Sequence, residues 1–414
     1  MKNRFSHLLI FLIALPISHP VQVTAKVNSS IGPFEIFSAD SASSIRLQFA
    51  GQLRLIYDSR DNGPDAARTE KLSMQARRIR LTLAGTVYNA NLSYRLHLST
   101  APKSLELMDF YFDYKFRPYL QFRFGQYKTP FTRYRIQSFQ RLAFVDWAIV
   151  TKYFGAERQM GFAFHNGYEQ PPKYGYIVGV FSGANARASH AIGLSDVYGE
   201  KVFNPSDLAN PGTTDKFHPE LFFHITYNAN NIKINSSSDE AKTGLRYSLG
   251  MSSAWDLFPT EYHDFSLRFA PELLVKYRGL SFLAAGYVGY SKIGDPAKNK
   301  PAMTGGLFQT AYRINSRFEI SARYAIVGFK DRLTDDARER AMQLIADSGN
   351  DPDVIEQYEN AGQILQEQEL TTGFNIYISG HSLKWQNDIG WLKHFFIDEN
   401  RDDYQIRSQF QVSF

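Results

Sequence analysis

Cysteine is absent from this chain of 414 residues. Without cysteine, the chain has neither a disulfide framework nor a residue for a lipoprotein anchor. Long apolar runs are missing as well, because no stretch reaches the roughly 20 apolar residues that a membrane-spanning helix needs. The net charge of +5 is small and its basic residues are dispersed, which gives no indication of nucleic-acid binding. These absences exclude a helical membrane protein and a disulfide-stabilised secreted domain.

Motifs for cofactor chemistry are also lacking. We find no glycine-rich phosphate loop, no Cys/His metal cluster and no nucleotide fingerprint, and the 10 histidines are scattered. Two pairs, Ser382 with His381 and Ser93 with His97, are the only nearby candidates for a hydrolase, and neither has a third residue to orient the imidazole. We therefore expect no catalytic residues, no cofactor and no metal.

The N-terminus has the features of an export signal. Lys2 and Arg4 precede a short apolar stretch over residues 8–17, and small residues follow at 23–25. This order is typical of a secretory signal peptide. The sequence predicts a cleaved signal peptide over residues 1–25, followed by a periplasmic segment over 26–43.

The last eleven residues alternate between apolar and polar side chains, with Ser408 as the one interruption. Tyr404, Ile406, Phe410, Val412 and Phe414 share one parity, whereas the other parity is polar throughout. Successive side chains of a strand point to opposite faces, so this strand has one apolar and one polar face. An edge strand of a soluble sandwich would show the same alternation. The terminal aromatic residue, however, resembles the signal that the outer-membrane barrel-assembly machinery reads, which makes that machinery an expected partner.

The rest of the chain repeats this alternation. We count about sixteen strands, an even number as in bacterial outer-membrane barrels. Short connections alternate with long ones, and the longest cover residues 127–157, 183–216 and 331–367. The chain has 33 Phe and 24 Tyr, which suits the aromatic girdles of a barrel. The sequence predicts an all-β fold, a transmembrane antiparallel β-barrel over residues 44–414, with short periplasmic turns and long extracellular loops. The predicted strands cover residues 44–57, 72–87, 91–99, 105–115, 119–126, 158–166, 174–182, 217–228, 242–256, 263–277, 280–292, 305–314, 317–330, 368–379, 382–393 and 403–414.

Two long connections have distinctive compositions. Residues 331–367 are acidic and predict two helices, at 337–346 and 353–366, which form either a solvated hairpin or a lid or cation site at the outer mouth. Residues 127–157 combine aromatic side chains with cations, so we expect this loop to fold into the lumen and constrict it. Its candidate constriction residues are Arg133, Arg135, Arg141 and Lys152.

A barrel of this size encloses water, so the face opposite the apolar one lines a channel. Inward carboxylates occur at Asp109, Asp113, Glu319 and Asp388. Two interpretations stay open: the inward arginines and carboxylates neutralise each other, or the surplus of arginines concentrates anions. The arginines that the alternation places inward, and that we take as candidate pore-lining residues, are Arg46, Arg54, Arg78, Arg80, Arg95, Arg123, Arg323 and Arg407.

Several segments resemble the phosphate-selective porin O and P family of Gram-negative outer membranes. The resemblance implies a trimeric porin of 16 strands with its third long loop inside and a cationic constriction. It adds Lys128 to the candidate anion-binding residues and, with Arg123, places it at the entry of that loop. Arg54, Arg78, Arg80 and Arg95 match the arginine-lined wall of the family in residue type. The segments that resemble the family are 75–85 (QARRIRLTLAG), 108–116 (MDFYFDYKF), 124–131 (FGQYKTPF), 157–161 (ERQMG), 176–181 (YIVGVF) and 373–381 (GFNIYISGH).

The function that these patterns favour is passive diffusion of small anions across a Gram-negative outer membrane, with phosphate or polyphosphate as candidate solutes. A general or sugar-permeable porin, with the loop aromatics as a stacking track, is the alternative. An outer-membrane hydrolase and an adhesin are weaker ones. Expected partners are small anionic solutes, outer-membrane lipid and lipopolysaccharide, and two further copies in a homotrimer.

Overall fold

A computed structural model describes most of the chain, and every structural statement below concerns that part. The described residues are 23–26, 34–38, 42–64, 66–101, 104–182, 196–199, 219–257, 265–291 and 300–414.

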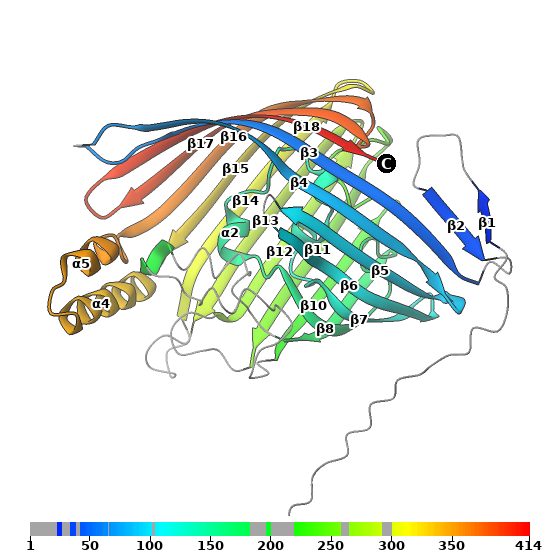
Figure 1. Cartoon of the computed structure of the whole chain (residues 1–414), viewed down its shortest axis with the longest axis horizontal. Helices are drawn as coiled ribbons and strands as arrows, with labels where there is room; N and C mark the ends of the chain where they lie inside the picture. The colour runs from blue at the N-terminus through cyan, green and yellow to red at the C-terminus, as the bar shows by residue number, and fades with distance from the viewer. Residues whose placement is uncertain are drawn as a thin grey trace, which may run out of the picture.

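Sixteen antiparallel strands, β3 to β18, form a closed barrel (Figure 1). Each strand pairs with the next in sequence, and β18 pairs with β3 to close the ring. All sixteen predicted strands are confirmed, within a few residues at their ends. Their bounds are β3 Ser44–Arg60, β4 Thr69–Val87, β5 Asn89–Ala101, β6 Ser104–Arg117, β7 Leu120–Lys128, β8 Arg158–His165, β9 Tyr174–Phe181, β10 Glu220–Ala229, β11 Arg246–Asp256, β12 Phe265–Tyr277, β13 Leu280–Ser291, β14 Lys300–Arg313, β15 Phe318–Phe329, β16 Ile364–Ser379, β17 Leu383–Phe396 and β18 Asn400–Ser413.

The alternation of the sequence explains the two faces of the wall. On β3, Leu53 and Leu55 are exposed on the outside of the barrel, whereas Gln52 and Arg54 between them are buried inside. Apolar side chains facing outward can meet lipid, and the closed ring leaves no unpaired strand edge within the membrane. Long connections gather at one end of the barrel, which we call the extracellular end, and most short turns lie at the other, periplasmic end.

The N-terminal region holds a hairpin that the sequence did not predict. β1 (Val23–Lys26) pairs with β2 (Phe34–Ser38), and β2 pairs with the start of β3 over residues 44–47. The predicted periplasmic segment over 26–43 thus contributes a strand that extends the sheet beyond the barrel (Figure 1). The predicted signal peptide lies outside the described residues except at 23–25, and β1 includes its predicted cleavage site.

The acidic connection between β15 and β16 is partly helical, as predicted. α4 (Asp331–Asp347) buries Leu333, Ala337 and Ala341, and α5 (Pro352–Tyr358) follows at the extracellular end. The second helix is shorter than predicted, because β16 already begins at Ile364. None of the helices in the described ranges has the length and apolar character needed to cross a membrane.

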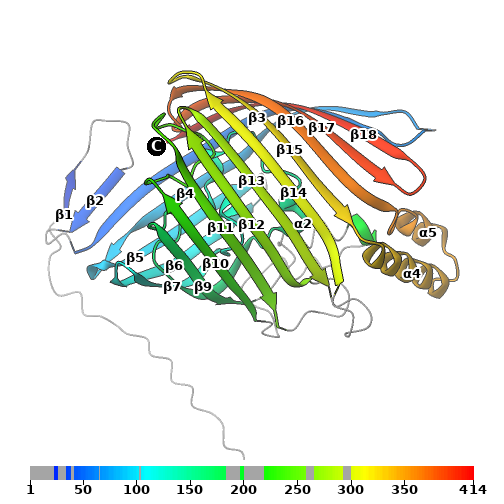
Figure 2. The ribbon, with the colours of Figure 1, turned by 180° about the vertical axis from the view of Figure 1, so that it is seen from behind.

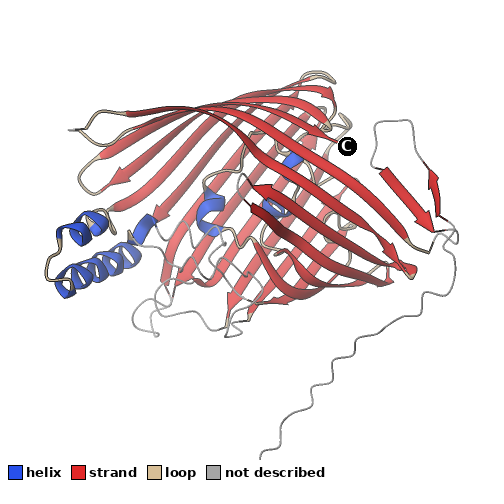
Figure 3. Ribbon diagram, in the orientation of Figure 1, coloured by secondary structure: helices blue, strands red, loops and turns tan. Residues whose placement is uncertain are grey.

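The connection between β7 and β8 folds into the barrel, as the sequence predicted. It contains α1 (Arg133–Ile136), the 3-10 helix η1 (Phe139–Arg141) and α2 (Val150–Phe154). These short helices lie within the ring of strands (Figure 3). Residues 129–157 are called the lumen loop below.

Candidate functional site: the lumen

One side of the lumen is filled by the lumen loop. Phe154 stacks on Tyr287 of β13 with ring centroids 5.2 Å apart, and Tyr153 meets Phe329 of β15 edge-on at 5.1 Å. Both loop residues are fully buried, and burying an aromatic side chain stabilises by about 1.5–3 kcal/mol. We call β9–β15 the packed wall, part of which Figure 2 shows from behind. The expectation that the whole inner face lines water is wrong here, because many of its inward residues are apolar and covered.

Carboxylates on the wall anchor the backbone of the lumen loop. Glu272 accepts hydrogen bonds from the backbone N–H groups of Arg133 at 2.7 Å and of Tyr134 at 3.3 Å. Asp388 accepts from the N–H of Val145 at 2.9 Å, and Glu369 from that of Ile149 at 2.6 Å. Charge-assisted hydrogen bonds of this kind are stronger than neutral ones. The loop is therefore fastened at three points around the ring.

The turn between β10 and β11 enters the lumen from the periplasmic end. The amino group of Lys276 donates to the carbonyl oxygens of Lys233, Ser236 and Ser238 at 2.8–2.9 Å. The segment over residues 232–239, called the inner turn below, also meets the lumen loop, since the N–H of Ser237 donates to the carbonyl of Arg141 at 3.1 Å. The inner turn narrows the periplasmic end on the side of the packed wall.

A carboxylate and three arginines meet at the middle of the lumen. Asp146 of the lumen loop lies 3.0 Å from Arg54 of β3 and 2.9 Å from Arg78 of β4. Arg77 approaches the same carboxylate at 3.9 Å. Burial raises the pKa of Asp146, but the guanidinium groups of Arg78 and Arg54 hold it well below its usual range. We call Arg54, Arg77 and Arg78 the arginine cluster.

Strict alternation would place Arg77 on the lipid face beside Ile79. A β-bulge changes this, because Gln52 and Leu53 of β3 pair with Arg78 and Ala76 of β4 and leave Arg77 as the extra residue. A bulge redirects the side chain of the inserted residue. Arg77 consequently reaches Asp146 instead of lipid, where an arginine would cost about 2–4 kcal/mol near the membrane centre.

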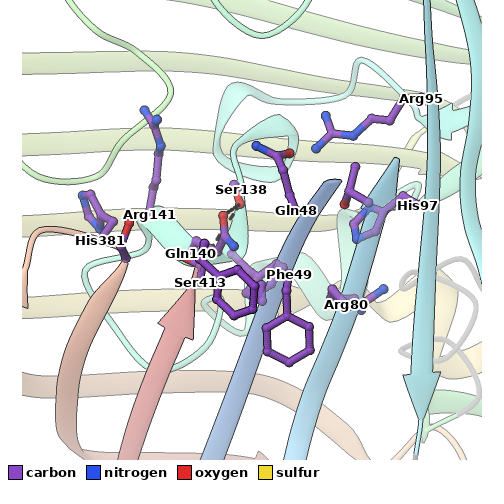
Figure 4. Close-up of a pocket in the computed structure, with 15 residues that line it drawn as sticks. Gln48, Phe49, Arg80, Arg95, His97, Ser138, Gln140, Arg141, His381 and Ser413 are labelled. Carbon is purple, nitrogen blue, oxygen red and sulfur yellow. Dashed lines mark hydrogen bonds between the residues drawn. The ribbon is translucent and has the colours of Figure 1, made fainter. Parts of the chain in front are cut away.

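Inside the periplasmic end lies a cationic cavity of about 220 Å³, called the inner cavity (Figure 4). Arg80, Arg95 and Arg141 line it, and no aspartate or glutamate does so among the described residues. Nε and Nη1 of Arg80 are buried and have no hydrogen-bond partner in this part of the chain. The polar side chains of Gln48 and His97 face the same space. The inner cavity therefore holds a local excess of positive charge.

A second cavity of about 90 Å³ shares Arg95, His97 and Phe139 with the inner cavity. Both acidic residues that line it are paired: Asp109 lies 2.6 Å from Arg158, and Glu169 lies 3.2 Å from Arg95. Its cations outnumber these carboxylates, so it continues the positive region along β5–β8.

The cavity on the extracellular side differs in its charge balance. This outer cavity has a volume of about 440 Å³ and is lined by four Arg or Lys side chains, four Asp or Glu side chains and His394, which lies 3.3 Å from the carboxylate of Asp403. Trp147 of the lumen loop lines it as well. The Arg78 guanidinium lies 5.2 Å from the Trp147 ring and 5.5 Å from that of Phe139, which lines the inner cavity. Arg78 therefore stands between the outer and inner cavities. The charged residues of the outer cavity are Arg60, Lys152, Arg323, Arg407, Asp58, Asp196, Glu369 and Asp403.

The candidate pore-lining residues fall into different environments. Arg407 is paired with Asp388 at 2.6 Å, and the Nε of Arg323 with Glu369 at 2.8 Å. Arg46 lies apart from the lumen groups and pairs with Glu35 of the N-terminal hairpin at 2.9 Å. Pairing with carboxylates thus accounts for much of the arginine wall.

The two residues at the entry of the lumen loop are enclosed. Arg123 pairs with Asp113 at 2.8 Å, and its guanidinium lies 4.1 Å from the ring of Tyr111 and 4.2 Å from that of Tyr168. The amino group of Lys128 donates to the carbonyls of Arg135 and Gln137 at 3.0 and 2.9 Å. Both residues border the second cavity, but their charged groups mainly contact other groups of the protein.

The four loop cations are also dispersed. Arg141 donates to Asn235 at 2.9 Å and borders the inner cavity, whereas Arg133 donates to Ser248 at 3.0 Å and lies buried away from it. Arg135 pairs with Glu157, and Lys152 pairs with Asp196. Only Arg141 contributes directly to the inner cavity.

Sequence reasoning missed three contributors: Asp146, Arg77 and Arg158. Strict alternation would place Arg77 on the lipid-facing side of its strand. A charged residue at such a position is a signal for a β-bulge. Nothing in the local pattern indicates that Asp146 would face β3 and β4 across the lumen.

Residues 49–233 match the family model described as phosphate-selective porin O and P. This stretch of the chain is similar to that family of outer-membrane porins. The match confirms the resemblance for the five segments between residues 75 and 181, and it covers the lumen loop and the arginine cluster, whereas the segment 373–381 lies outside it. A search of curated protein sequences found no match.

Solved structures share the fold of this chain. OprB of Pseudomonas putida aligns with a TM-score of 0.55 at 14% identity over 91% of this chain and 95% of its own. The outer-membrane channel DcaP of Acinetobacter baumannii gives 0.54 at 12% identity over 91% and 99%. An anion-selective porin from Comamonas acidovorans gives 0.50 at 11% identity over 89% and 100%. These identities are low, so the likeness concerns the fold.

The family match and the fold point to a non-enzymatic channel, and the serine–histidine pairs considered above do not form. His97 is bonded to Asp109 at 2.8 Å and His381 to Glu240 at 2.9 Å, while the Ser93 hydroxyl donates to the carbonyl of Asp113. Across the described ranges no group of three or more His, Cys, Asp or Glu is placed to hold a metal ion.

Proposed function

We propose that this protein is a porin that conducts small anions by passive diffusion and that its preference for anions arises at the inner cavity. The observation that carries the proposal is the lining of that cavity by Arg80, Arg95 and Arg141 without an acidic side chain. Arg95 pairs with Glu169, but Arg80 and Arg141 have no carboxylate partner among the described residues, and such guanidinium groups attract anions and hold them by forked hydrogen bonds. Phosphate and polyphosphate are candidate solutes of matching chemistry.

The route that we propose follows the polar wall, formed by β16–β18 and β3–β8. A solute enters the outer cavity, passes the arginine cluster beside Asp146, and leaves through the inner cavity. The nearly balanced charge of the outer cavity favours neither anions nor cations, so the selection of anions takes place at the arginine cluster and the inner cavity. Conduction requires that each station bind weakly enough to release the ion to the next.

The test is the reversal potential of single channels in a planar bilayer under a salt gradient. We expect the wild-type channel to prefer chloride over potassium and the R80Q/R141Q variant to lose much of this preference. The matched control is R60Q/K152Q, which removes two cations from the outer cavity. Equal losses in both variants would contradict an inner selectivity site.

A general or sugar-permeable porin is the second candidate. It is favoured by the aromatic side chains of the outer cavity, Trp147, Trp391 and Tyr404, which offer faces for stacking. Liposome swelling with uncharged sugars distinguishes the two, since a selective anion channel would admit gluconate salts faster than sugars of equal size.

We make further proposals about how the protein reaches the outer membrane and assembles there. We propose export through a cleaved signal peptide, recognition of β18 by the barrel-assembly machinery, and assembly as a homotrimer in contact with lipopolysaccharide. The alternating C-terminal strand and the barrel fold support them. Mass spectrometry of the mature N-terminus and of the native oligomer in detergent tests the first and third.

A further inference from the structure

The inner cavity is larger than a small inorganic anion requires. Its volume is about 220 Å³, whereas a cavity of about 150 Å³ already holds a six-membered ring. A single phosphate or chloride ion would therefore leave much of the space to water. The size of the cavity suits an organic solute that carries an anionic group.

One side of the inner cavity lacks hydrogen-bond acceptors. Arg80 on β4 and Arg95 on β5 lie on this side, to the right in Figure 4. Nε and Nη1 of Arg80 and Nε of Arg95 are buried without a partner among the described residues. A guanidinium group only donates hydrogen bonds, so a ligand on this side has to supply acceptor oxygens. A carboxylate or a phosphate group does so.

The opposite side of the inner cavity lacks a hydrogen-bond donor at one atom. Nε2 of His381, in the turn between β16 and β17, lies 2.9 Å from the Glu240 carboxylate. Burial lowers the pKa of His381, so at pH 7 the imidazole is neutral and its N–H group faces that carboxylate. Nδ1 is then an acceptor, and it is buried without a partner in the described part of the chain. Chloride and fully ionised phosphate have no hydrogen to donate to it, whereas a hydroxyl group has.

Neutral polar side chains lie between these two sides. Figure 4 shows Gln48 of β3 and Ser138 and Gln140 of the lumen loop in this position. Amide and hydroxyl groups both donate and accept hydrogen bonds. Arg141 lies on the side of His381 and donates to Asn235 at 2.9 Å. The lining therefore combines free cationic donors with neutral groups and an acceptor.

We propose that the inner cavity binds polyol anions, in which one carboxylate or phosphate group is joined to a body of several hydroxyl groups. The anionic group contacts Arg80 and Arg95, and the hydroxyl groups contact Gln48, Gln140 and His381. Sugar acids and sugar phosphates share this chemistry. This inference rests on the proposed anion channel and names the solute class of its inner cavity.

The test compares pairs of anions as blockers of the chloride current in planar bilayers at pH 8. Glucose 6-phosphate is compared with inorganic phosphate, gluconate with acetate, and sorbitol serves as the uncharged polyol. We expect each polyol anion to reach half-block at a concentration roughly tenfold lower than its simple counterpart, as two hydrogen bonds of ordinary net strength would give. Sorbitol should block far more weakly. A gain in the phosphate pair alone supports the inference for sugar phosphates, and a gain in the carboxylate pair alone supports it for sugar acids.

Two variants separate the contacts of the hydroxyl groups from those of the anionic group. Q48L/H381F should raise the half-block concentration of glucose 6-phosphate to that of inorganic phosphate and leave the value for inorganic phosphate unchanged. R80Q should weaken block by both. Q405L, which removes a glutamine from the outer cavity, is the matched control and should change neither. If Q48L/H381F does not assemble into folded barrels, judged by heat-modifiable migration on gels, Q48L alone should lose about threefold.

The outcomes distinguish this inference from the proposed function. Equal half-block concentrations within both pairs in the wild type would overturn the inference, as would a tenfold gain that persists in Q48L/H381F. Either result, in a wild-type channel that prefers chloride over potassium, leaves the proposed function intact. A wild-type channel without preference for anions contradicts the proposed function itself.

Discussion

The two sides of the lumen use the same strand alternation for opposite purposes. Along the packed wall, inward residues meet the lumen loop and the inner turn, and Phe154, Tyr153 and Phe222 are fully buried. Along the polar wall, inward arginines and glutamines border the three larger cavities. The difference shows that a barrel of this size need not be a uniform pipe. One side holds the constricting segment, which leaves the other side to interact with solutes.

The largest expected effect concerns the packed wall. F154A removes a fully buried ring that stacks on Tyr287, and such a truncation costs about 3–5 kcal/mol. We expect a large loss in the free energy of unfolding, measured by urea titration in detergent micelles, with little change in the ion preference of channels that fold. F139A, on the partly exposed side of the loop, is the control and should cost less. Equal losses of unfolding free energy in F154A and F139A would contradict the proposed difference between the packed wall and the polar wall.

Reversing charge at the inner cavity comes next. R80E/R141E replaces two of its three lining arginines with acids, and we expect the permeability ratio of chloride to potassium to fall roughly tenfold, a change of about 1.4 kcal/mol. The matched variant R60E/K152E alters the balanced outer cavity and should change the ratio less. Reversal potentials measure both, and a larger effect in the outer variant would place selectivity there.

A smaller effect, on single-channel conductance, is expected when the inner turn is shortened. Replacing residues 232–240 by a two-residue Asn-Gly turn removes the segment that Lys276 holds by three carbonyl contacts. Because the periplasmic end would widen on the packed side, we expect single-channel conductance to rise about twofold, with a weaker preference for anions. Unchanged conductance would mean that the current is limited elsewhere, at the arginine cluster.

The smallest effect involves the pair Glu240 and His381 at the periplasmic end. The hydrogen bond from His381 lowers the pKa of Glu240 to about 2, although burial opposes this. A depressed pKa stabilises the fold above the usual glutamate value of 4.5, and this stabilisation is lost as the pH falls through about 2. Since the Glu240 carboxylate is 43% exposed, we expect E240Q to cost only about 1 kcal/mol at pH 7.

Urea titrations at several pH values check this last expectation. The difference between wild type and E240Q should be constant from pH 7 to about 5 and shrink at lower pH. A difference that grows on acidification would have the wrong sign for a lowered pKa.

Much of the fold could be predicted from sequence because the alternation of side chains is a local property. It located all sixteen strands and, with loop composition, the lumen loop. The partners of the arginines could not be predicted in this way. Asp146 is far from Arg54 and Arg78 in sequence, and their contact depends on the path of a loop with no periodic pattern. The bulge at Arg77 also broke the alternation on which the assignment of faces relied.

The N-terminal hairpin bears on how the barrel closes. β2 covers residues 44–47 of β3, β18 covers residues 50–59, and Phe49 and Phe414 exchange backbone hydrogen bonds between these two stretches. One edge of β3 is thus shared by a neighbour that is close in sequence and one from the far end of the chain. A hairpin forms in microseconds, whereas the ends of a long chain meet late. The hairpin formed by β2 and β3, which cleavage after residue 25 would leave intact, can therefore occupy the first residues of this edge before β18 pairs, and so fix the residue of β3 at which the last strand must end.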